Sequence, residues 1–214
     1  MKTSVSLWSA DLLDVGAAIA CVEAEVAGFH IDIMDGHFVP ELTFGPDFVR
    51  AVAKRTHRLV DVHLMVGDAE RWIEPFVAAG AGMLTIHPRS CADAVSALRS
   101  IRSCRIGAGI AVELGDALED VQSLLREVDR VLLMGTALGV KGVEIDTAVY
   151  ERIRQVAKWR EQSQLNVEIY VDGGIRKHTA PFIAMAGADG VTPGSLVYGA
   201  ADPAAVVRWL ATLP

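Results

Sequence analysis

Long apolar runs, cysteines and basic residues are all in short supply in this chain, and each shortage excludes a class of protein. No apolar run approaches the roughly 18 to 20 residues of a membrane span, so we expect no membrane association. Lys and Arg number 20 against 27 for Asp and Glu, and the net charge of −7 argues against a general nucleic-acid-binding protein. Three cysteines, Cys21, Cys91 and Cys104, are odd in number and lack metal-ligand spacing, which predicts buried thiols in a reducing compartment.

The remaining composition is that of a folded enzyme-sized domain. Hydrophobic residues make up 51% of the 214 residues, which is enough apolar surface for a substantial core and excludes general disorder. The segment Met1–Ala10 holds one lysine and no apolar signal core, so we expect a cytoplasmic location. No linker, low-complexity tract or break in composition divides the chain, and we therefore predict one domain over residues 1–214.

Short apolar runs alternate with amphipathic stretches along the whole chain. The predicted strands are Ser4–Trp8, Gly28–Ile33, Leu59–Met65, Met83–His87, Arg105–Val112, Arg130–Met134, Asn166–Val171 and Gly190–Thr192. The predicted helices are Asp11–Ala24, Pro46–Lys54, Ala69–Ala79, Cys91–Ser100, Ala117–Glu127, Asp146–Gln162, Thr179–Ala186 and Ala201–Leu213. Eight strands each followed by a helix are typical of a single-domain (β/α)₈ TIM barrel.

Glycine-containing phrases support this alternation. Ala79–Gly82, Ala186–Asp189 and Val26–Gly28 each predict the end of a helix and a tight turn into a strand. A doubly wound open sheet is the structural alternative, but the segment after its first strand, Ser9–Asp11, lacks the glycine-rich turn of a dinucleotide site. The barrel is therefore the favoured architecture.

Polar side chains gather at the predicted strand ends, where the active sites of such barrels lie. Side chains alternate along a strand, so His30, Asp32 and Met34 face the same way. His63 follows on the third strand and Asp172 ends the seventh. A lone His or Asp at a strand end is commonly a hydrogen-bonded structural residue, but two of each converging from three strands predict a divalent-metal site. Imidazole and carboxylate ligands suit Zn²⁺, Fe²⁺, Mn²⁺ or Co²⁺ better than Mg²⁺ or Ca²⁺.

Other residues near these strand ends have two possible roles. The methionines Met34, Met65 and Met134 are either core gap-fillers or an apolar lid over a planar reaction intermediate. Turns need glycine in any case, but Gly173-Gly174 and Gly194-Ser195 follow strands seven and eight, where barrels often bind phosphate. Lys141, between Gly139 and Gly142, is either a charge that closes over this anion or a solvated surface lysine. We assign supporting roles to three further residues: Asp35, His37 and Asp61.

Several of these segments together resemble the ribulose-phosphate 3-epimerase family. They are Ser6–Asp11, Phe29–Pro40, Asp61–Met65, Val171–Ile175 and Gly194-Ser195. The likeness runs through essentially the whole chain in the right order, and its most specific part is the twelve-residue stretch around Asp32. The resemblance implies a ribulose-phosphate-binding type of TIM barrel, an isomerase that inverts C3 of a ketose phosphate, and no organic cofactor.

The same resemblance assigns individual roles. It implies that one divalent cation, Zn, Fe, Mn or Co, is held by His30, Asp32, His63 and Asp172, and that Asp32 and Asp172 are the acid–base pair flanking a metal-stabilised enediolate. The resemblance and the positions at the strand ends together predict a set of substrate contacts. They are Ser6, His63, Met34, Met65, Met134, Gly139, Lys141, Gly142, Gly173, Gly174, Gly194 and Ser195. The partner is a small phosphorylated sugar, and a homo-oligomer is expected.

Departures from the family pattern leave the sugar open. The loop Thr136–Val143 keeps two glycines of the family loop but not its Pro, Phe or Gln, and His87-Pro88-Arg89 is more similar to the allulose-6-phosphate branch. The substrate is thus either of the ribulose 5-phosphate/xylulose 5-phosphate type or a hexulose or other modified ketose phosphate. A related phosphosugar decarboxylase would need a lysine where Met34 stands, and an inactive sugar-phosphate-binding barrel would not need two acid–base carboxylates.

Overall fold

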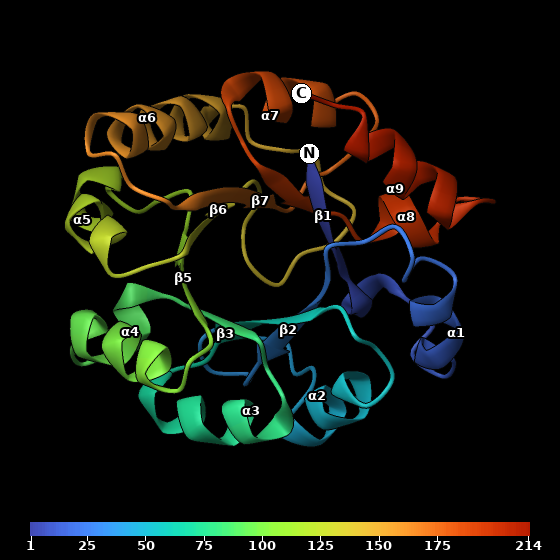
Figure 1. Cartoon of the computed structure of the whole chain (residues 1–214), viewed down its shortest axis with the longest axis horizontal. Helices are drawn as coiled ribbons and strands as arrows, with labels where there is room; N and C mark the ends of the chain where they lie inside the picture. The colour runs from blue at the N-terminus through green and yellow to red at the C-terminus, as the bar shows by residue number, and fades with distance from the viewer.

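The computed structural model describes residues 1–214 as a closed barrel of eight parallel strands in the order β1 to β8 (Figure 1). The strands are β1 (Lys2–Ser6), β2 (Gly28–Met34), β3 (Leu59–Met65), β4 (Met83–Ile86), β5 (Gly107–Val112), β6 (Arg130–Met134), β7 (Glu168–Asp172) and β8 (Gly190–Thr192). Each strand pairs with its neighbour in the chain, and β1 pairs with β8 to complete the circle. The predicted (β/α)₈ barrel is confirmed.

Helices surround the barrel as an outer ring (Figure 1). They are α1 (Val15–Ala20), α2 (Pro46–Ala53), α3 (Ile73–Ala79), α4 (Ala94–Ser103), α5 (Leu118–Gln122), α6 (Ala148–Gln162), α7 (Ala180–Ala186), α8 (Ser195–Tyr198) and α9 (Pro203–Ala211). Short 3₁₀ helices occupy Leu7–Ser9, Glu70–Trp72, Pro88–Ser90 and Ser123–Arg126. None of these helices combines the length and apolar character needed to cross a bilayer.

Strand β2 shows how the sequence divides its side chains between two environments. All seven of its residues are buried. Ile31 and Ile33 belong to the main hydrophobic core, whereas Met34 packs in a separate apolar cluster with Met65. His30 and Asp32 lie on the same side of the strand as Met34, inside the barrel. Alternate residues of β2 thus face the outer core and the barrel interior, which confirms the predicted alternation. Both faces are buried because the parallel strand is covered on both sides.

A network of charges fills the inside of the barrel beneath the strand ends. The buried Arg130 places Nη1 2.9 Å from Asp61 Oδ2 and Nη2 2.8 Å from Glu168 Oε2. Its guanidinium stacks 3.7 Å from the centre of the Tyr170 ring, and Ser4 Oγ donates to Asp61 Oδ2 at 3.2 Å. Burial tends to raise the pKa of Asp61, but Arg130, His30 and Ser4 together outweigh it and the pKa falls to about 2. Asp61 is thus an ionised anchor, consistent with the predicted supporting role.

Several predicted boundaries are wrong. The first helix begins at Val15 rather than Asp11, because the Asp14 side chain accepts from Ala17 N and caps it there. Strand β5 begins at Gly107 rather than Arg105, whose φ of 62° breaks the extended backbone. The short helix α8 has no counterpart among the predicted elements, since four residues carry too little periodicity to detect.

Two of the three predicted glycine turns are confirmed. Gly80 (φ 101°) and Gly187 (φ 107°) end α3 and α7 in the left-handed conformation. The prediction for Val26–Gly28 is wrong: Gly28 lies in β2, where a Cβ would come within 2.7 Å of the Leu59 carbonyl oxygen. This glycine therefore permits close pairing of β2 with β3 instead of a turn.

The cysteines are free, but the prediction that they are buried is wrong. Cys21 is exposed, and Cys91 and Cys104 are partly exposed.

The chain ends meet at one side of the barrel, where the Met1 ammonium donates to the Leu213 carbonyl oxygen at 2.8 Å. Figure 1 shows the labelled termini on this side of the ring.

Gly80→Ala is expected to destabilise the fold by about 1 to 3 kcal/mol, because a Cβ at this left-handed residue would lie 2.8 Å from Ala53 Cβ. Urea unfolding should show a lower midpoint at an unchanged slope. Gly115→Ala is the control, since no atom lies within 4 Å of a Cβ there. Equal midpoints for the two variants would contradict this account of the α3 end.

Candidate active site

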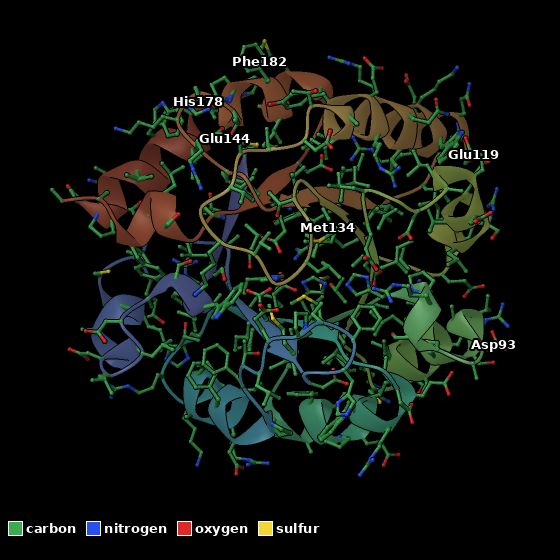
Figure 2. All side chains as sticks on the ribbon, turned by 180° about the vertical axis from the view of Figure 1, so that it is seen from behind. Asp93, Glu119, Met134, Glu144, His178 and Phe182 are labelled. Carbon is green, nitrogen blue, oxygen red and sulfur yellow. The ribbon has the colours of Figure 1, made fainter.

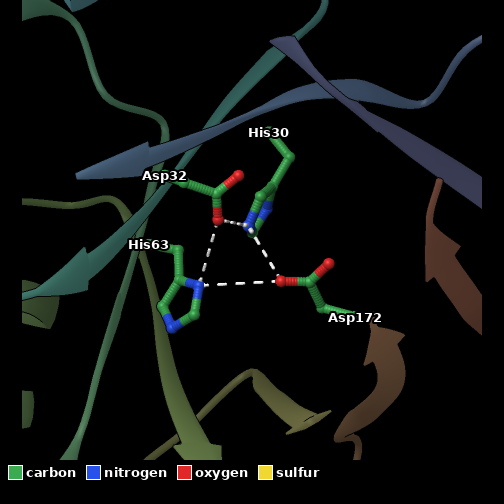
Figure 3. Close-up of side chains that lie close together, drawn as sticks. All are labelled: His30, Asp32, His63 and Asp172. Carbon is green, nitrogen blue, oxygen red and sulfur yellow. Dashed lines mark ion pairs between the residues drawn. The ribbon is translucent and has the colours of Figure 1, made fainter. Parts of the chain in front are cut away.

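Four ionisable side chains converge inside the barrel mouth (Figure 3). His30 and Asp32 come from β2, His63 from β3 and Asp172 from the end of β7. One nitrogen or oxygen atom of each lies within 4.8 Å of those of the others. Asp32 and His63 are directly paired in the sheet register, whereas Asp172 reaches the group from across the barrel. The structure thus brings together all four predicted metal ligands.

The inward-facing atoms of this group form a ring of short separations (Figure 3). Asp32 Oδ1 lies 3.2 Å from His30 Nε2 and 3.4 Å from His63 Nδ1. Asp172 Oδ2 lies 3.9 Å from each of these two nitrogens. Ser6 Oγ donates to the other Asp32 oxygen, Oδ2, at 2.8 Å. The Asp32 carboxylate is therefore oriented by a hydroxyl on one side and by two imidazoles on the other.

Each imidazole uses its outer nitrogen to fix its orientation. His30 Nδ1 lies 3.0 Å from Asp61 Oδ2, and His63 Nε2 lies 2.9 Å from His87 Nε2. The inner nitrogens, His30 Nε2 and His63 Nδ1, are buried and make no hydrogen bond. Buried polar atoms without a partner are costly, and a cation held by these two nitrogens and the two carboxylates would satisfy them. The residues present fit a divalent metal of the mixed nitrogen–oxygen class.

The two carboxyl groups of the site have opposite pKa shifts. Burial tends to raise the pKa of Asp32, but its contacts with His30 and His63 outweigh this and hold the pKa well below the usual range. Burial and the neighbouring charge of Asp32 raise the pKa of Asp172 to about 7. One carboxyl therefore stays ionised while the other can gain or lose a proton near neutral pH, which suits an acid–base pair.

A cavity of about 300 Å³ opens above the four-residue cluster. Asp32 and Asp172 line it, and so do these predicted substrate contacts: Ser6, Met34, Met65, Met134, Gly139, Lys141, Gly142, Gly173, Gly174, Gly194 and Ser195. His63 differs, because its ring is fully buried and does not line the cavity. In Figure 2 the labelled Met134 lies near the centre of the ring of helices, at the mouth of the barrel.

The methionines supply the apolar part of this cavity. Met34 and Met65 are paired across β2 and β3 and pack with Val39. Met134 packs beside Tyr170 in a second apolar cluster and is paired with Asp172 in the register of β6 and β7. These thioethers stand next to the carboxyls without offering hydrogen-bond donors, as the lid interpretation requires.

Glycines and one arginine build the opposite end of the cavity. Gly173 and Gly174 have φ values of 88° and 69°, and a Cβ on Gly174 would lie 2.6 Å from the Ile145 backbone. Arg176 also lines the cavity, and its Nη1 lies 3.5 Å from Ser195 Oγ. Sequence reasoning missed Arg176, although it stands only two residues beyond the Gly173-Gly174 pair. A guanidinium at this place adds a positive charge to the predicted phosphate end.

Lys141 lies on the loop after β6 and lines the cavity. Its ammonium donates to the Trp8 carbonyl oxygen at 2.6 Å and stands 3.8 Å from the centre of the Trp8 ring. Burial lowers the pKa of Lys141. The exposed Lys141 side chain therefore fastens the loop after β6 to the loop after β1 at the cavity.

Asp35 holds two further mouth loops. Its carboxylate accepts from the backbone N–H groups of His37, Phe38 and Gly67, which follow β2 and β3. The His37 ring is outside the cavity, and its Nδ1 lies 3.0 Å from the Asp35 carbonyl oxygen. Both residues have the supporting positions that the sequence predicted.

Solved structures similar to this chain share its barrel. A 3-hexulose-6-phosphate synthase from Salmonella typhimurium aligns with a TM-score of 0.68 and 21% identity, covering 100% of this chain and 98% of that one. A structure named KGPDC from Streptococcus mutans gives a TM-score of 0.73 at 13% identity, covering 98% and 95%. At these identities the likeness establishes the fold alone.

Sequence comparison identifies a specific family. The model described as the ribulose-phosphate 3 epimerase family matches residues 2–198. A protein of Bacillus subtilis (strain 168) named ribulose-phosphate 3-epimerase is 36% identical over 204 residues, which is 94% of each chain. One of Mycobacterium tuberculosis (strain ATCC 25618 / H37Rv) with the same name is 38% identical over 181 residues, or 85% of this chain and 79% of that protein. The chain therefore belongs to the ribulose-phosphate 3-epimerase family and is an isomerase of the carbohydrate epimerase class.

Proposed function

We propose that this protein inverts C3 of a ketose phosphate of the ribulose 5-phosphate/xylulose 5-phosphate type, with Asp32 and Asp172 as the two acid–base groups. The observation that carries the proposal is the position of these carboxyls. They come from β2 and β7, line one cavity and have opposite pKa shifts. The substrate named in the relatives is consistent with this arrangement.

Epimerisation next to a ketone needs two groups on opposite faces of the substrate. A base on one face removes the C3 proton and leaves a planar enediolate, and an acid on the other face returns a proton to the same carbon. A single carboxyl cannot reach both faces. The ionised Asp32, oriented by Ser6, is suited to remove the proton, and Asp172, whose pKa is raised to about 7, is suited to carry the proton that is returned. In the reverse reaction the two residues exchange roles.

We propose His30, Asp32, His63 and Asp172 as the ligands of a divalent cation, Zn, Fe, Mn or Co. When bound, the cation would supply Lewis-acid stabilisation of the negative charge that develops on the substrate oxygens. The chain's own residues then carry the proton transfers, while Met34, Met65 and Met134 exclude water from the reacting face.

The phosphate is assigned to the end of the cavity formed by Gly173, Gly174, Gly194 and Ser195, with Arg176 beside them. The glycines let a ligand approach the backbone N–H groups closely, and the guanidinium supplies a charge-assisted hydrogen bond. The anionic substrate is thereby held with its carbonyl end toward the carboxyls.

A hexulose phosphate such as allulose 6-phosphate is the second candidate substrate. It is favoured by His87-Pro88-Arg89, which is more similar to the allulose-6-phosphate branch. The loop Thr136–Val143 departs from the family pattern, lines the cavity and is fastened to Trp8 through Lys141, which leaves the sugar open. Initial rates with ribulose 5-phosphate and allulose 6-phosphate, measured side by side, distinguish the two.

We also propose that the protein is cytoplasmic and forms a homo-oligomer.

Asp32→Asn and Asp172→Asn are each expected to lower kcat by about 10²-fold or more, because each removes one of the two acid–base groups. NMR should follow both epimer formation and the entry of solvent deuterium at C3. Asp47→Asn is the control, since this aspartate is exposed on α2, outside the cavity. Wild-type turnover in both site variants would defeat the two-base mechanism.

Removal of divalent metal by a chelator is expected to abolish turnover, and added Zn²⁺, Fe²⁺, Mn²⁺ or Co²⁺ should restore it. Binding should also raise the melting temperature, because the cation binds the folded state and satisfies buried nitrogen atoms. Differential scanning fluorimetry with and without each metal measures this second effect. Full turnover in protein shown to be metal-free would contradict the assignment.

Arg176→Met is expected to raise KM for the phosphorylated ketose about tenfold with little change in kcat, because it removes a charge-assisted contact made equally in the ground and transition states. Lys177→Met is the matched control: it removes the same charge one residue away, on an exposed side chain outside the cavity. Steady-state kinetics on both variants make the comparison. Equal KM values for the two would remove Arg176 from the phosphate end.

A further inference from the structure

A line of polar side chains runs from His63 away from the cavity. His63 Nε2 lies 2.9 Å from His87 Nε2, and His87 Nδ1 lies 3.2 Å from Glu113 Oε1. Both rings are fully buried and nearly parallel, with centres 5.0 Å apart. His87 directly follows β4 and Glu113 directly follows β5, so three successive strand ends supply the three residues. His87 Nδ1 is buried and makes no hydrogen bond, so its polar contact is the approach of Glu113 Oε1 to 3.2 Å.

The hydrogen-bonding capacities of the rings give this line a direction. A neutral imidazole carries its proton on one nitrogen and a lone pair on the other. If His63 Nδ1 faces a cation, its proton is on Nε2 and is donated to His87 Nε2. The His87 proton is then on Nδ1, pointing at Glu113, whose carboxylate can only accept. One carboxylate is thus sufficient to set both tautomers.

Glu113 is held in place for this role. Arg89 Nε donates to Glu113 Oε1 at 2.5 Å, and its guanidinium stacks 3.7 Å from the centre of the Phe38 ring. Partial burial tends to raise the pKa of Glu113, but contacts with His87 and Arg89 outweigh it and lower the pKa to about 2. The carboxylate therefore stays ionised, and remains an acceptor, throughout the neutral range.

The other imidazole of the cluster has the same arrangement in a shorter form. His30 Nδ1 contacts Asp61 Oδ2 directly, and Arg130 anchors that carboxylate. On the His63 side, the His87 imidazole lies between the His63 ring and the Glu113 carboxylate. Arg89 contacts that carboxylate, as Arg130 contacts Asp61. His30 and His63 thus share one arrangement: on the side away from the cluster, each is linked to a carboxylate that an arginine contacts.

We propose that Glu113, acting through His87, is a positioning residue that sets the tautomer and ring orientation of His63 for a divalent cation. The inference rests on the proposed metal site and extends it to two residues that touch neither substrate nor cation. Such partners behind a ligating histidine typically affect metal affinity by about 10- to 100-fold.

The test measures the affinity of Zn²⁺ alone, by competition with a chromophoric chelator, for the wild type and its variants. Glu113→Leu is expected to weaken Zn²⁺ binding by about 10-fold or more, and Glu113→Gln by less, because its amide oxygen still accepts. Glu127→Leu is the matched control: its side chain is 24% exposed against 23% for Glu113, and it too pairs with an arginine, Arg99, outside the cavity. Arg89→Leu should weaken Zn²⁺ binding less than Glu113→Leu does, because it removes the anchor of Glu113 but leaves the carboxylate beside His87.

Wild-type affinity in Glu113→Leu would overturn the positioning role while leaving the metal site intact. Failure of the wild type itself to bind Zn²⁺ would instead refute the proposed metal site. A second measurement needs no variant: ¹⁵N NMR of the histidine side chains in the zinc-loaded wild type. The expected result is a proton on His63 Nε2 and on His87 Nδ1. A proton on His87 Nε2 would exclude the inferred direction, whatever the stability of the variants.

Discussion

Two carboxyl groups and two imidazoles share one buried space at the barrel mouth, and the rest of the site depends on that concentration of charge. Asp32 and Asp172 repel each other across a few ångströms, and this repulsion adds to burial in raising the pKa of Asp172 to about 7. His30 and His63 offset it by facing the Asp32 carboxylate. An acid and a base can therefore coexist in one cavity near neutral pH.

Below this cluster, the polar interior of the barrel serves orientation more than stability. Buried ion pairs seldom contribute more to folding than apolar residues of similar volume would. The contact of Arg130 with Asp61 nevertheless has a clear consequence, because the Asp61 carboxylate fixes His30 Nδ1. Arg89 and Glu113 repeat the pattern behind His87. The proposed divalent cation would need imidazoles turned to present a lone pair, and we propose that these anchors set that orientation.

Much of the site was predictable because strands have a period of two. His30, Asp32 and Met34 had to share a face of β2, and the barrel order places β3 with His63 beside it. The glycines at 80 and 187 were equally predictable, since a helix end that needs a positive φ selects glycine. The turn predicted at Gly28 is wrong because, in the sequence alone, a glycine that permits close strand pairing cannot be distinguished from one that permits a turn.

The sequence by itself therefore determined the barrel, the residues that face its interior and the family, since these follow from local periodicity and contiguous motifs. Only the tertiary structure decided which loop residues meet. Arg176 with Ser195, Lys141 with Trp8 and Glu113 with His87 are pairs from loops after different strands. Their spacing along the chain carries no signal of these contacts, because closure of the barrel, and not the local backbone, sets the distances across its mouth.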